Sequence, residues 1–176
     1  MACQLLYAHP HQETSPLAAC WVKQELSTFV FSTLCVLSAG YDTKMWSDMA
    51  QTIHVFEHNI HYMEIAKNAV GKAHNVVFHN ASLKHRQALP LDNGICNVTV
   101  VDSSLDYQGG YHRQKAMQEG VRVTGHAGIV FLDDANRQDE QTQLKRYCLE
   151  YNVRKIRNGF ARCLPKHKRE RSDTVN

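Results

Sequence analysis

The sequence predicts an α/β protein: a three-layer α-β-α sandwich around a mostly parallel seven-stranded sheet that closes with a C-terminal antiparallel hairpin. Short apolar runs rich in β-branched residues alternate with segments of helical periodicity, which is typical of parallel strands covered on both faces. Polar residues or glycine end each apolar run. The pair Asn158-Gly159 separates the last two runs and is a strong hairpin signal.

The length of the chain is that of one ordinary domain. Its 176 residues are 43% hydrophobic, which is enough to bury a sizeable core. No repeat or linker divides the sequence. We therefore expect a single domain over residues 1–165 and a basic, frayed tail over residues 166–176.

Charge and composition exclude several classes of protein. The formal charge is only +3 and both signs are interspersed, so nucleic acid is not indicated as a partner. No apolar run could span a bilayer and the start lacks the features of a signal peptide, which predicts a cytoplasmic protein without a membrane partner. The six cysteines form no C-x-x-C pair and most of them lie in apolar segments, so we expect reduced core cysteines.

The elements of the first half follow from local signals. Ser15 can cap a helix whose first residue is Pro16. An uncharged strand over residues 29–37 then stops at Ser38-Ala39-Gly40. The next predicted elements are a helix over 43–50, a strand over 53–56 that ends on Glu57, a helix over 60–72 and a strand over 75–79.

The second half continues the same alternation. Pro90 and Asp92-Asn93-Gly94 break residues 83–94, which predicts a loop or a short helix there. A strand over 95–101 follows and ends on Asp102. The remaining predicted elements are a helix over 112–119, a strand over 128–132, a helix over 138–151 and strands over 153–157 and 160–164.

The ends of the predicted strands carry the candidate functional residues. In an open parallel sheet, ligands bind outside the carboxyl ends of the strands, where the strand order reverses. Gly40 permits close backbone approach to a ligand, and Glu57 is placed to accept both hydroxyl protons of a ribose. The full set of strand-end residues is Ser38, Ala39, Gly40, Glu57, Asn80, Ala81, Asp102, Asp133 and Asp134.

Three stretches resemble the class I S-adenosylmethionine (SAM) dependent methyltransferases, over roughly residues 15–165. I-H-V-F-E-H-N-I-H-Y-M-E-I-A-K is similar to the acidic second strand and following helix of that family, and N-V-T-V-V-D-S-S resembles its fourth strand. G-I-V-F-L-D-D-A-N-R-Q-D-E-Q resembles the Asp-Asp-x-x-Arg end of strand five in some small members. The resemblance implies SAM as cofactor, with contacts from Ser38, Ala39, Gly40, Glu57, His58, Asn80, Ala81 and Asp102.

The first glycine motif departs from the family pattern. The matching stretch is V-L-S-A-G-Y-D-T, in which Ser38 replaces the first glycine and Gly40 retains the second. Val36 or its neighbour stands where the family has a carboxylate that holds the amino group of the cofactor. Losing such a charge-assisted hydrogen bond removes on the order of 1.5–3 kcal/mol, so weaker or rearranged SAM binding is expected. Asp42 lies close enough in sequence to substitute.

The resemblance also implies candidate catalytic groups. Asp102 is the first candidate for a general base, followed by Asp134 and Arg137 on the neighbouring strand end. In one branch of the family, similar acids hold a divalent ion, and Asp102 with Asp133 or Asp134 is the weaker, metal-binding alternative. The Asp-Asp-x-x-Arg segment could instead be an ion-paired turn that fixes a loop. Tyr111, His112 and Arg113 could face the methyl acceptor or simply begin a helix.

Three functions remain open at this point. The first is a SAM-dependent methyltransferase with a small-molecule or other acceptor. The second is an inactive, methyltransferase-like binding or scaffold protein, which the altered glycine motif favours. The third, a nucleotide-dependent oxidoreductase, requires G-x-G-x-x-G after the first strand, and Ser38-Ala39-Gly40-Tyr41-Asp42-Thr43 does not supply it.

Overall fold

The computed structural model describes residues 16–27, 31–83, 88–102, 112–154 and 159–166. The predicted cap at Ser15, the turn residue Asn158, Tyr111 and most of the predicted tail lie outside these residues. The elements in chain order are α2 (Pro16–Leu26), β1 (Thr33–Leu37), α3 (Asp42–Ser47), β2 (Thr52–Glu57), α4 (Ile60–Val70), β3 (Val76–Asn80), β4 (Cys96–Val101), α5 (His112–Val123), β5 (Thr124–Asp133), α6 (Gln138–Tyr147), β6 (Cys148–Arg154) and β7 (Phe160–Pro165).

One seven-stranded sheet organises the fold, with strand order β3-β2-β1-β4-β5-β7-β6. Strands β1 to β5 are parallel to one another. Strand β7 pairs antiparallel with β5 and with β6, so the closing hairpin inserts its second strand next to β5. The predicted fold class, mostly parallel with a C-terminal antiparallel hairpin, is confirmed.

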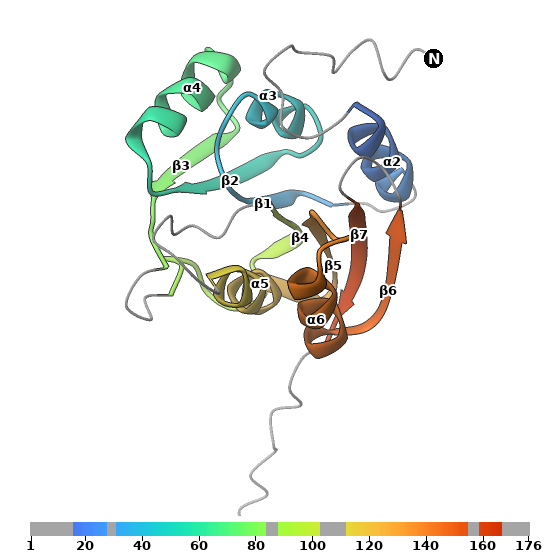
Figure 1. Cartoon of the computed structure of the whole chain (residues 1–176). Helices are drawn as coiled ribbons and strands as arrows, with labels where there is room; N and C mark the ends of the chain where they lie inside the picture. Colours follow the sequence, from blue (N-terminus) through green and yellow to red (C-terminus); the bar gives the residue numbers. More distant parts are fainter. Residues whose placement is uncertain (1–15, 28–30, 84–87, 103–111, 155–158, 167–176) are drawn as a thin grey trace, which may run out of the picture.

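Helices cover both faces of this sheet (Figure 1). Helices α2, α3 and α4 lie above it, and α5 and α6 lie below it. Two clusters of buried side chains mark the two interfaces: Trp21, Trp46 and Phe131 belong to the upper cluster, and Met117 and Leu144 to the lower one. Among the described residues, no helix has the length and apolar character needed to cross a membrane.

The strand register brings the carboxyl ends of the central strands to one edge of the sheet. Leu37 at the end of β1 is level with Phe56 on β2 and with Val101 on β4. Val101 is in turn level with Leu132 on β5. The polar residues that follow these positions therefore begin at the same edge, as the sequence predicted for a parallel sheet.

Several element boundaries differ from the prediction: α5 runs to Val123 rather than 119, β5 begins at Thr124 rather than 128, and β6 begins at Cys148 rather than 153. Strand β1 begins at Thr33, because the Asn97 side-chain oxygen accepts the N–H groups of Ser32 and Thr33, each at 3.0 Å, and replaces a ladder partner there. The helix predicted over 138–151 is wrong beyond Tyr147, since β6 begins at Cys148 and pairs along β7. Pairing with β7 outweighs the helical periodicity of this segment.

The prediction of reduced core cysteines is also wrong. Disulfides join Cys35 to Cys96 and Cys148 to Cys163, and no cysteine among the described residues is free. The folded sheet brings each pair to Cα separations of 5.9 and 5.4 Å, within disulfide range, although 61 residues separate the first pair in sequence. Because disulfides are rare in the cytosol, these bonds count against the predicted cytoplasmic location, which stays a prediction.

Candidate functional site

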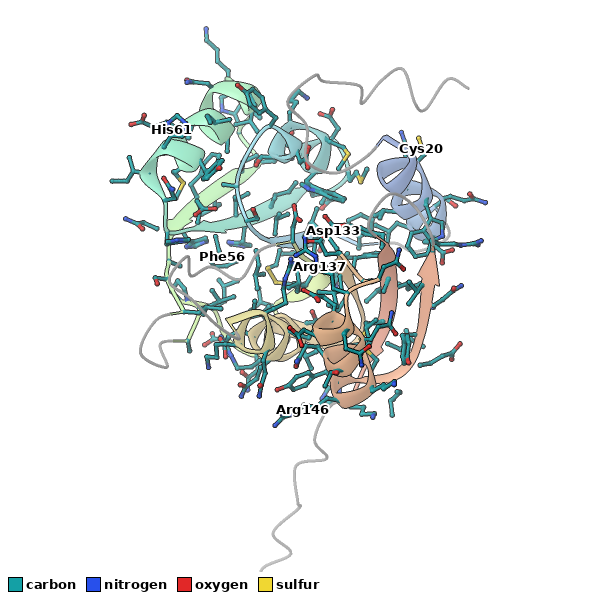
Figure 2. The ribbon with its side chains drawn as sticks, in the orientation of Figure 1. Cys20, Phe56, His61, Asp133, Arg137 and Arg146 are labelled. Carbon is teal, nitrogen blue, oxygen red and sulfur yellow. A yellow bond between two sulfur atoms is a disulfide. The ribbon has the colours of Figure 1, made fainter. Side chains whose placement is uncertain are left out.

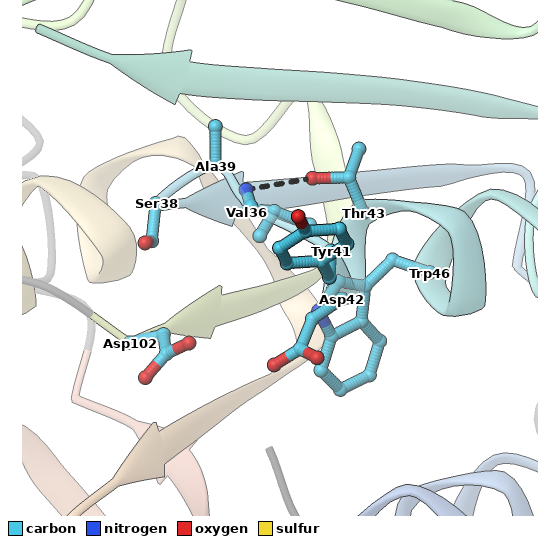
Figure 3. Close-up of a pocket in the computed structure, with 9 residues that line it drawn as sticks. Val36, Ser38, Ala39, Tyr41, Asp42, Thr43, Trp46 and Asp102 are labelled. Atoms are coloured by element: carbon cyan, nitrogen blue, oxygen red, sulfur yellow. Dashed lines mark hydrogen bonds between the residues drawn. The ribbon is translucent and has the colours of Figure 1, made fainter. Parts of the chain in front are cut away.

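A cavity that is partly open to solvent, with about 250 Å³ of non-atom space including that solvent, lies at the carboxyl ends of β1 and β4 (Figure 3). These two strands are neighbours at the centre of the sheet, and the helix that follows β1 covers one face while the helix that follows β4 covers the other. The cavity therefore lies at the topological switch point, where open α/β sheets bind ligands. Its lining residues are Val36, Ser38, Ala39, Gly40, Tyr41, Asp42, Thr43, Trp46 and Asp102.

The loop after β1 forms one wall of the cavity. Gly40 donates its N–H to the Thr43 hydroxyl at 3.3 Å, which ties the loop to the first turn of α3. A methyl group placed on Gly40 would meet no atom within 4 Å, so the backbone there faces open space. Ser38 has a φ of 154°, which side-chain-bearing residues rarely adopt. The loop thus keeps a glycine-like conformation at the position where the glycine is missing.

Glu57 ties the end of β2 to this loop. Its Oε2 atom accepts the N–H of Ala39 at 3.1 Å, and its Oε1 atom accepts the N–H groups of His58 and Asn59, each at 2.8 Å. The His58 ring atom Nδ1 lies 3.0 Å from Oε1. The Glu57 side chain is buried and does not line the cavity. Its carboxylate holds backbone in place, and the three N–H donors leave one of about four acceptor sites, on Oε2, for a further donor.

Asp102 faces the loop from the end of β4. Its N–H donates to the Leu37 carbonyl at 3.3 Å, which fixes the two strand ends against each other. Removal from solvent is the main cause that raises the pKa of the Asp102 carboxyl well above its ordinary value. The nearby carboxyl groups of Asp133, which hydrogen-bonds the Asp102 side chain, and of Asp42 raise it further. Asp102 therefore keeps its proton to a higher pH than an exposed aspartate does.

Arg113 on α5 connects the ends of β4 and β5. It donates to the Asp102 carbonyl at 2.7 Å and to Asp134 at 3.0 Å, and its Nε atom lies 3.3 Å from Glu140 on α6. Arg137, labelled in Figure 2, pairs with Asp134 at 2.9 Å, but its side chain is 59% exposed. Asp134 thus lies between two guanidinium groups, which is the ion-paired turn that was the alternative to a metal site.

The described residues offer little support for a metal site. Among them, no group of three or more His, Cys, Asp or Glu side chains is arranged to hold a metal ion. Asp134 is directed to Arg113 and Arg137 instead. A cation bound by Asp102, Asp133 and Asp134 together would have to displace these guanidinium groups.

The predicted cofactor-binding residues fall into two groups. Ser38, Ala39, Gly40 and Asp102 surround the cavity, and Glu57 contacts this group through Ala39. Asn80 and Ala81 lie one strand further out, where Ala81 donates to the Glu57 carbonyl at 3.0 Å. They are next to Glu57 but outside the lining, and so is His58.

Sequence reasoning missed the position of Arg113. From the sequence, Arg113 could either select the acceptor or simply begin a helix, whereas in the structure its part-buried guanidinium joins three segments. The basic residue lies in the first turn of α5, where the helix dipole disfavours a cation, and this is the only local signal of a special role. Asp42 and Trp46 do line the cavity, although the sequence gave Trp46 no functional role.

Comparison with known proteins identifies the fold. No family model matches the chain, and no curated protein matches its sequence. A solved structure from Staphylococcus aureus, assigned as a caffeoyl-CoA O-methyltransferase, is similar with a TM-score of 0.71 at 13% identity, over 88% of this chain and 86% of that one.

Two further solved structures are similar. The N-methyltransferase NodS from Bradyrhizobium japonicum has a TM-score of 0.64 at 14% identity, over 86% of this chain and 95% of that one. The tRNA (m1A58) methyltransferase TrmI from Aquifex aeolicus has a TM-score of 0.64 at 12% identity, over 92% of this chain and 73% of that one. The chain therefore has the fold of the class I SAM-dependent methyltransferases.

Proposed function

We propose that the protein binds SAM at the cavity between β1 and β4 and transfers its methyl group to an acceptor. One observation carries the proposal: in a sheet with this strand order, the cavity lies at the switch point and is lined by the Ser38-Ala39-Gly40 loop and by Asp102. SAM supplies an activated methyl group on a cationic sulfur, and the protein positions the acceptor for in-line transfer.

The lining suggests which residues along the sheet edge would contact each part of the cofactor. The cavity is partly open to solvent and encloses room for little more than a water molecule, so we place the methionine end of SAM against its lining rather than inside it. Asp42 is the residue we propose for the amino group, since Val36 offers no carboxylate. Glu57 would accept the ribose hydroxyls, while His58, Asn80 and Ala81 would border the adenine on a more open surface.

Asp102 is the residue we propose for proton transfer from the acceptor. It reaches the cavity, and a raised pKa brings a carboxylic acid closer to the range useful for acid-base catalysis. For Asp134 and Arg137 we propose a positioning role instead, because both act on Arg113 or on each other outside the lining. We propose a small-molecule acceptor; the names of the similar structures include both caffeoyl-CoA and tRNA.

An inactive binding protein is the second candidate. Val36 and Ser38 favour it, because they occupy two positions where the family pattern has a carboxylate and a glycine. Binding and transfer must therefore be measured separately.

Isothermal titration of the full chain with SAM and with S-adenosylhomocysteine (SAH) tests the proposal. We expect a Kd in the micromolar range for SAM, weakened at least about tenfold by Glu57→Gln, which removes the charge that would hold the ribose hydroxyls and replaces one oxygen that accepts a backbone N–H of the loop by an NH2 group. Asp48→Asn is the matched control, since Asp48 is exposed and outside the cavity. The absence of heat for both ligands at about 1 mM would reject the proposal.

Transfer is then followed with methyl-labelled SAM in an extract separated into small molecules and macromolecules. Label in the small-molecule fraction supports the methyltransferase and the proposed acceptor class. Binding without any protein-dependent label supports the inactive candidate.

A further inference from the structure

The strand at the end of the sheet order, β6, has an open edge (Figure 1). Within the described part of the chain, β7 is the only strand that pairs with it. The pairing is regular from Glu150 to Arg154, and its irregularity lies between Cys148 and Glu150. Proteins commonly protect such an edge with proline or with charges that repel a second strand. Strand β6 contains no proline, and its two charged residues have opposite signs.

The charged residues of β6 lie on the face of the sheet that α2 covers. Glu150, Asn152 and Arg154 alternate along the strand and are exposed, whereas the residues between them pack against the lower cluster. The Arg154 guanidinium lies 5.7 Å from the centroid of the Trp21 ring on α2. This contact keeps the cation on the upper face, because the face of an aromatic ring attracts it. One carboxylate and one guanidinium therefore lie on the same face beside the open edge.

The spacing of these charges suits one pairing of β6 with a copy of itself. In an antiparallel pair of identical strands, inward-pointing and outward-pointing backbone groups alternate, so the two-fold axis must fall on a residue. An axis on Glu150 or Arg154 places two like charges opposite each other, which is destabilising. An axis on Tyr151 or Val153 places a charged residue opposite Asn152. Only an axis on Asn152 places Glu150 opposite Arg154, and by symmetry it does so twice.

We propose that β6 pairs antiparallel with β6 of a second copy of this chain, with the two-fold axis at Asn152. The two seven-stranded sheets then join into one continuous sheet. The contact is isologous, since the same residues of both copies form it. Backbone hydrogen bonds along the edge supply the affinity, and the two Glu150–Arg154 pairs select the register. Leu149, which is 74% exposed at the start of the strand, loses part of its contact with water.

The pairing leaves the proposed SAM site intact. Strand β6 runs in the same direction as β5, because both pair antiparallel with β7. In the second copy every strand runs the opposite way, so the two cavities open at opposite edges of the joined sheet. The described cavity lining contains no residue of β6. The dimer is therefore independent of the proposed function, and a variant that breaks it should keep its affinity for SAM.

Sedimentation equilibrium of the full chain over about 1–100 µM measures the assembly, and we expect a dimer with a Kd in the micromolar range. Glu150→Arg and Arg154→Glu should each raise this Kd at least about tenfold, because each places two pairs of like charges across the edge. Glu64→Arg is the matched control, since Glu64 is exposed on α4, toward the other end of the sheet. It makes the same change of charge as Glu150→Arg and should leave the dimer unchanged.

Two combinations test the register itself. Glu150→Arg and Arg154→Glu in one chain exchange the charges, so opposite charges face each other again and the dimer should return. A mixture of the two single variants should form a mixed dimer, because one copy carries only positive and the other only negative charges at these positions. Neither result is expected if another surface joins the copies. Circular dichroism and thermal unfolding establish that each variant is folded.

A chain that stays monomeric at about 100 µM overturns the proposal, whatever segment covers the edge. A dimer that both single variants leave unchanged also overturns it. Should a variant not fold, hydrogen exchange of the wild-type protein provides the second measurement. Alternate amides of β6 should exchange more slowly as the protein concentration rises, since the outward N–H groups gain partners. Exchange that is independent of concentration contradicts the pairing.

Discussion

Two carboxyl groups of this protein are withdrawn from solvent, but their surroundings shift their pKa values in opposite directions. Glu119 on α5 accepts hydrogen bonds from Arg122 at 2.7 and 3.0 Å and from the N–H of Leu89 at 2.9 Å, and Lys115 lies 3.4 Å away. Although burial alone would raise it, these partners hold the pKa of Glu119 below its ordinary value. Asp102 meets mainly other carboxyl groups, and its pKa is raised.

The difference separates a site whose charges are paired within the protein from the proposed cofactor site. Glu119 and Arg122 fix the segment before β4, because Arg122 also donates to the carbonyls of Leu89 and Leu91. Every charge there has a partner within the protein. Around Asp102 the protein leaves a charge imbalance next to a cavity, which costs stability and favours a role in binding.

Glu119→Ala should have the largest effect on stability. It leaves the Leu89 N–H without its acceptor and Arg122 without its carboxylate, next to a buried part of the core. Breaking a fully buried ion pair costs about 3–5 kcal/mol, and because Arg122 is 26% exposed we expect about 2–3 kcal/mol here. Urea unfolding at neutral pH measures the loss.

The pH dependence provides the control for this effect. Because the folded-state pKa of Glu119 is depressed, its stabilisation is present above about pH 4.5 and is lost as the pH falls through the depressed value. Glu119→Gln keeps an acceptor for Leu89 and should lie between the wild-type protein and the alanine variant. A stability of Glu119→Ala equal to that of the wild type would show that the two regions do not differ as described.

Asp102→Asn should change stability less, and in the opposite direction. An amide removes the repulsion from Asp133 and Asp42 and can still donate to Asp133, so we expect a gain of about 1 kcal/mol at neutral pH. With a raised folded-state pKa, the contribution of Asp102 is fully present below about pH 3.8 and is lost as the pH rises through the raised value. The variant should show a flatter stability curve over that range.

Unfolding measurements across this pH range check the prediction, and SAM titration of the same variant separates stability from binding. If Asp102→Asn is less stable than the wild-type protein at neutral pH, Asp102 is a compensated structural carboxylate like Glu119.

The sequence could predict the strand ends but not the contacts between them. Polar residues after apolar runs located Gly40, Glu57 and Asp102 correctly at one edge, because the carboxyl ends of parallel strands must meet there. The disulfide between Cys35 and Cys96 depends on strand order, which local patterns do not contain. The same holds for Arg113, whose partners come from three other segments.

Ser38→Gly should have the smallest effect. It tests the unusual backbone conformation of Ser38 in the loop that lines the cavity. A non-glycine residue at a φ of 154° carries backbone strain of order 1–3 kcal/mol, and glycine offsets part of the relief by about 0.5–1 kcal/mol through its greater freedom in the unfolded chain. Because a φ of 154° lies near the extended region, the strain is at the low end of its range, and we expect a net gain of up to about 1 kcal/mol in urea unfolding.

Ser38→Ala is the matched control, because it removes the same hydroxyl group but keeps the Cβ atom. A gain in Ser38→Gly alone assigns the effect to the backbone, and equal effects in both variants would assign it to the hydroxyl. SAM affinity should change little, since the Ala39–Glu57 and Gly40–Thr43 hydrogen bonds already hold the loop. In that case the missing glycine costs stability rather than binding, and the altered motif by itself does not argue for an inactive protein.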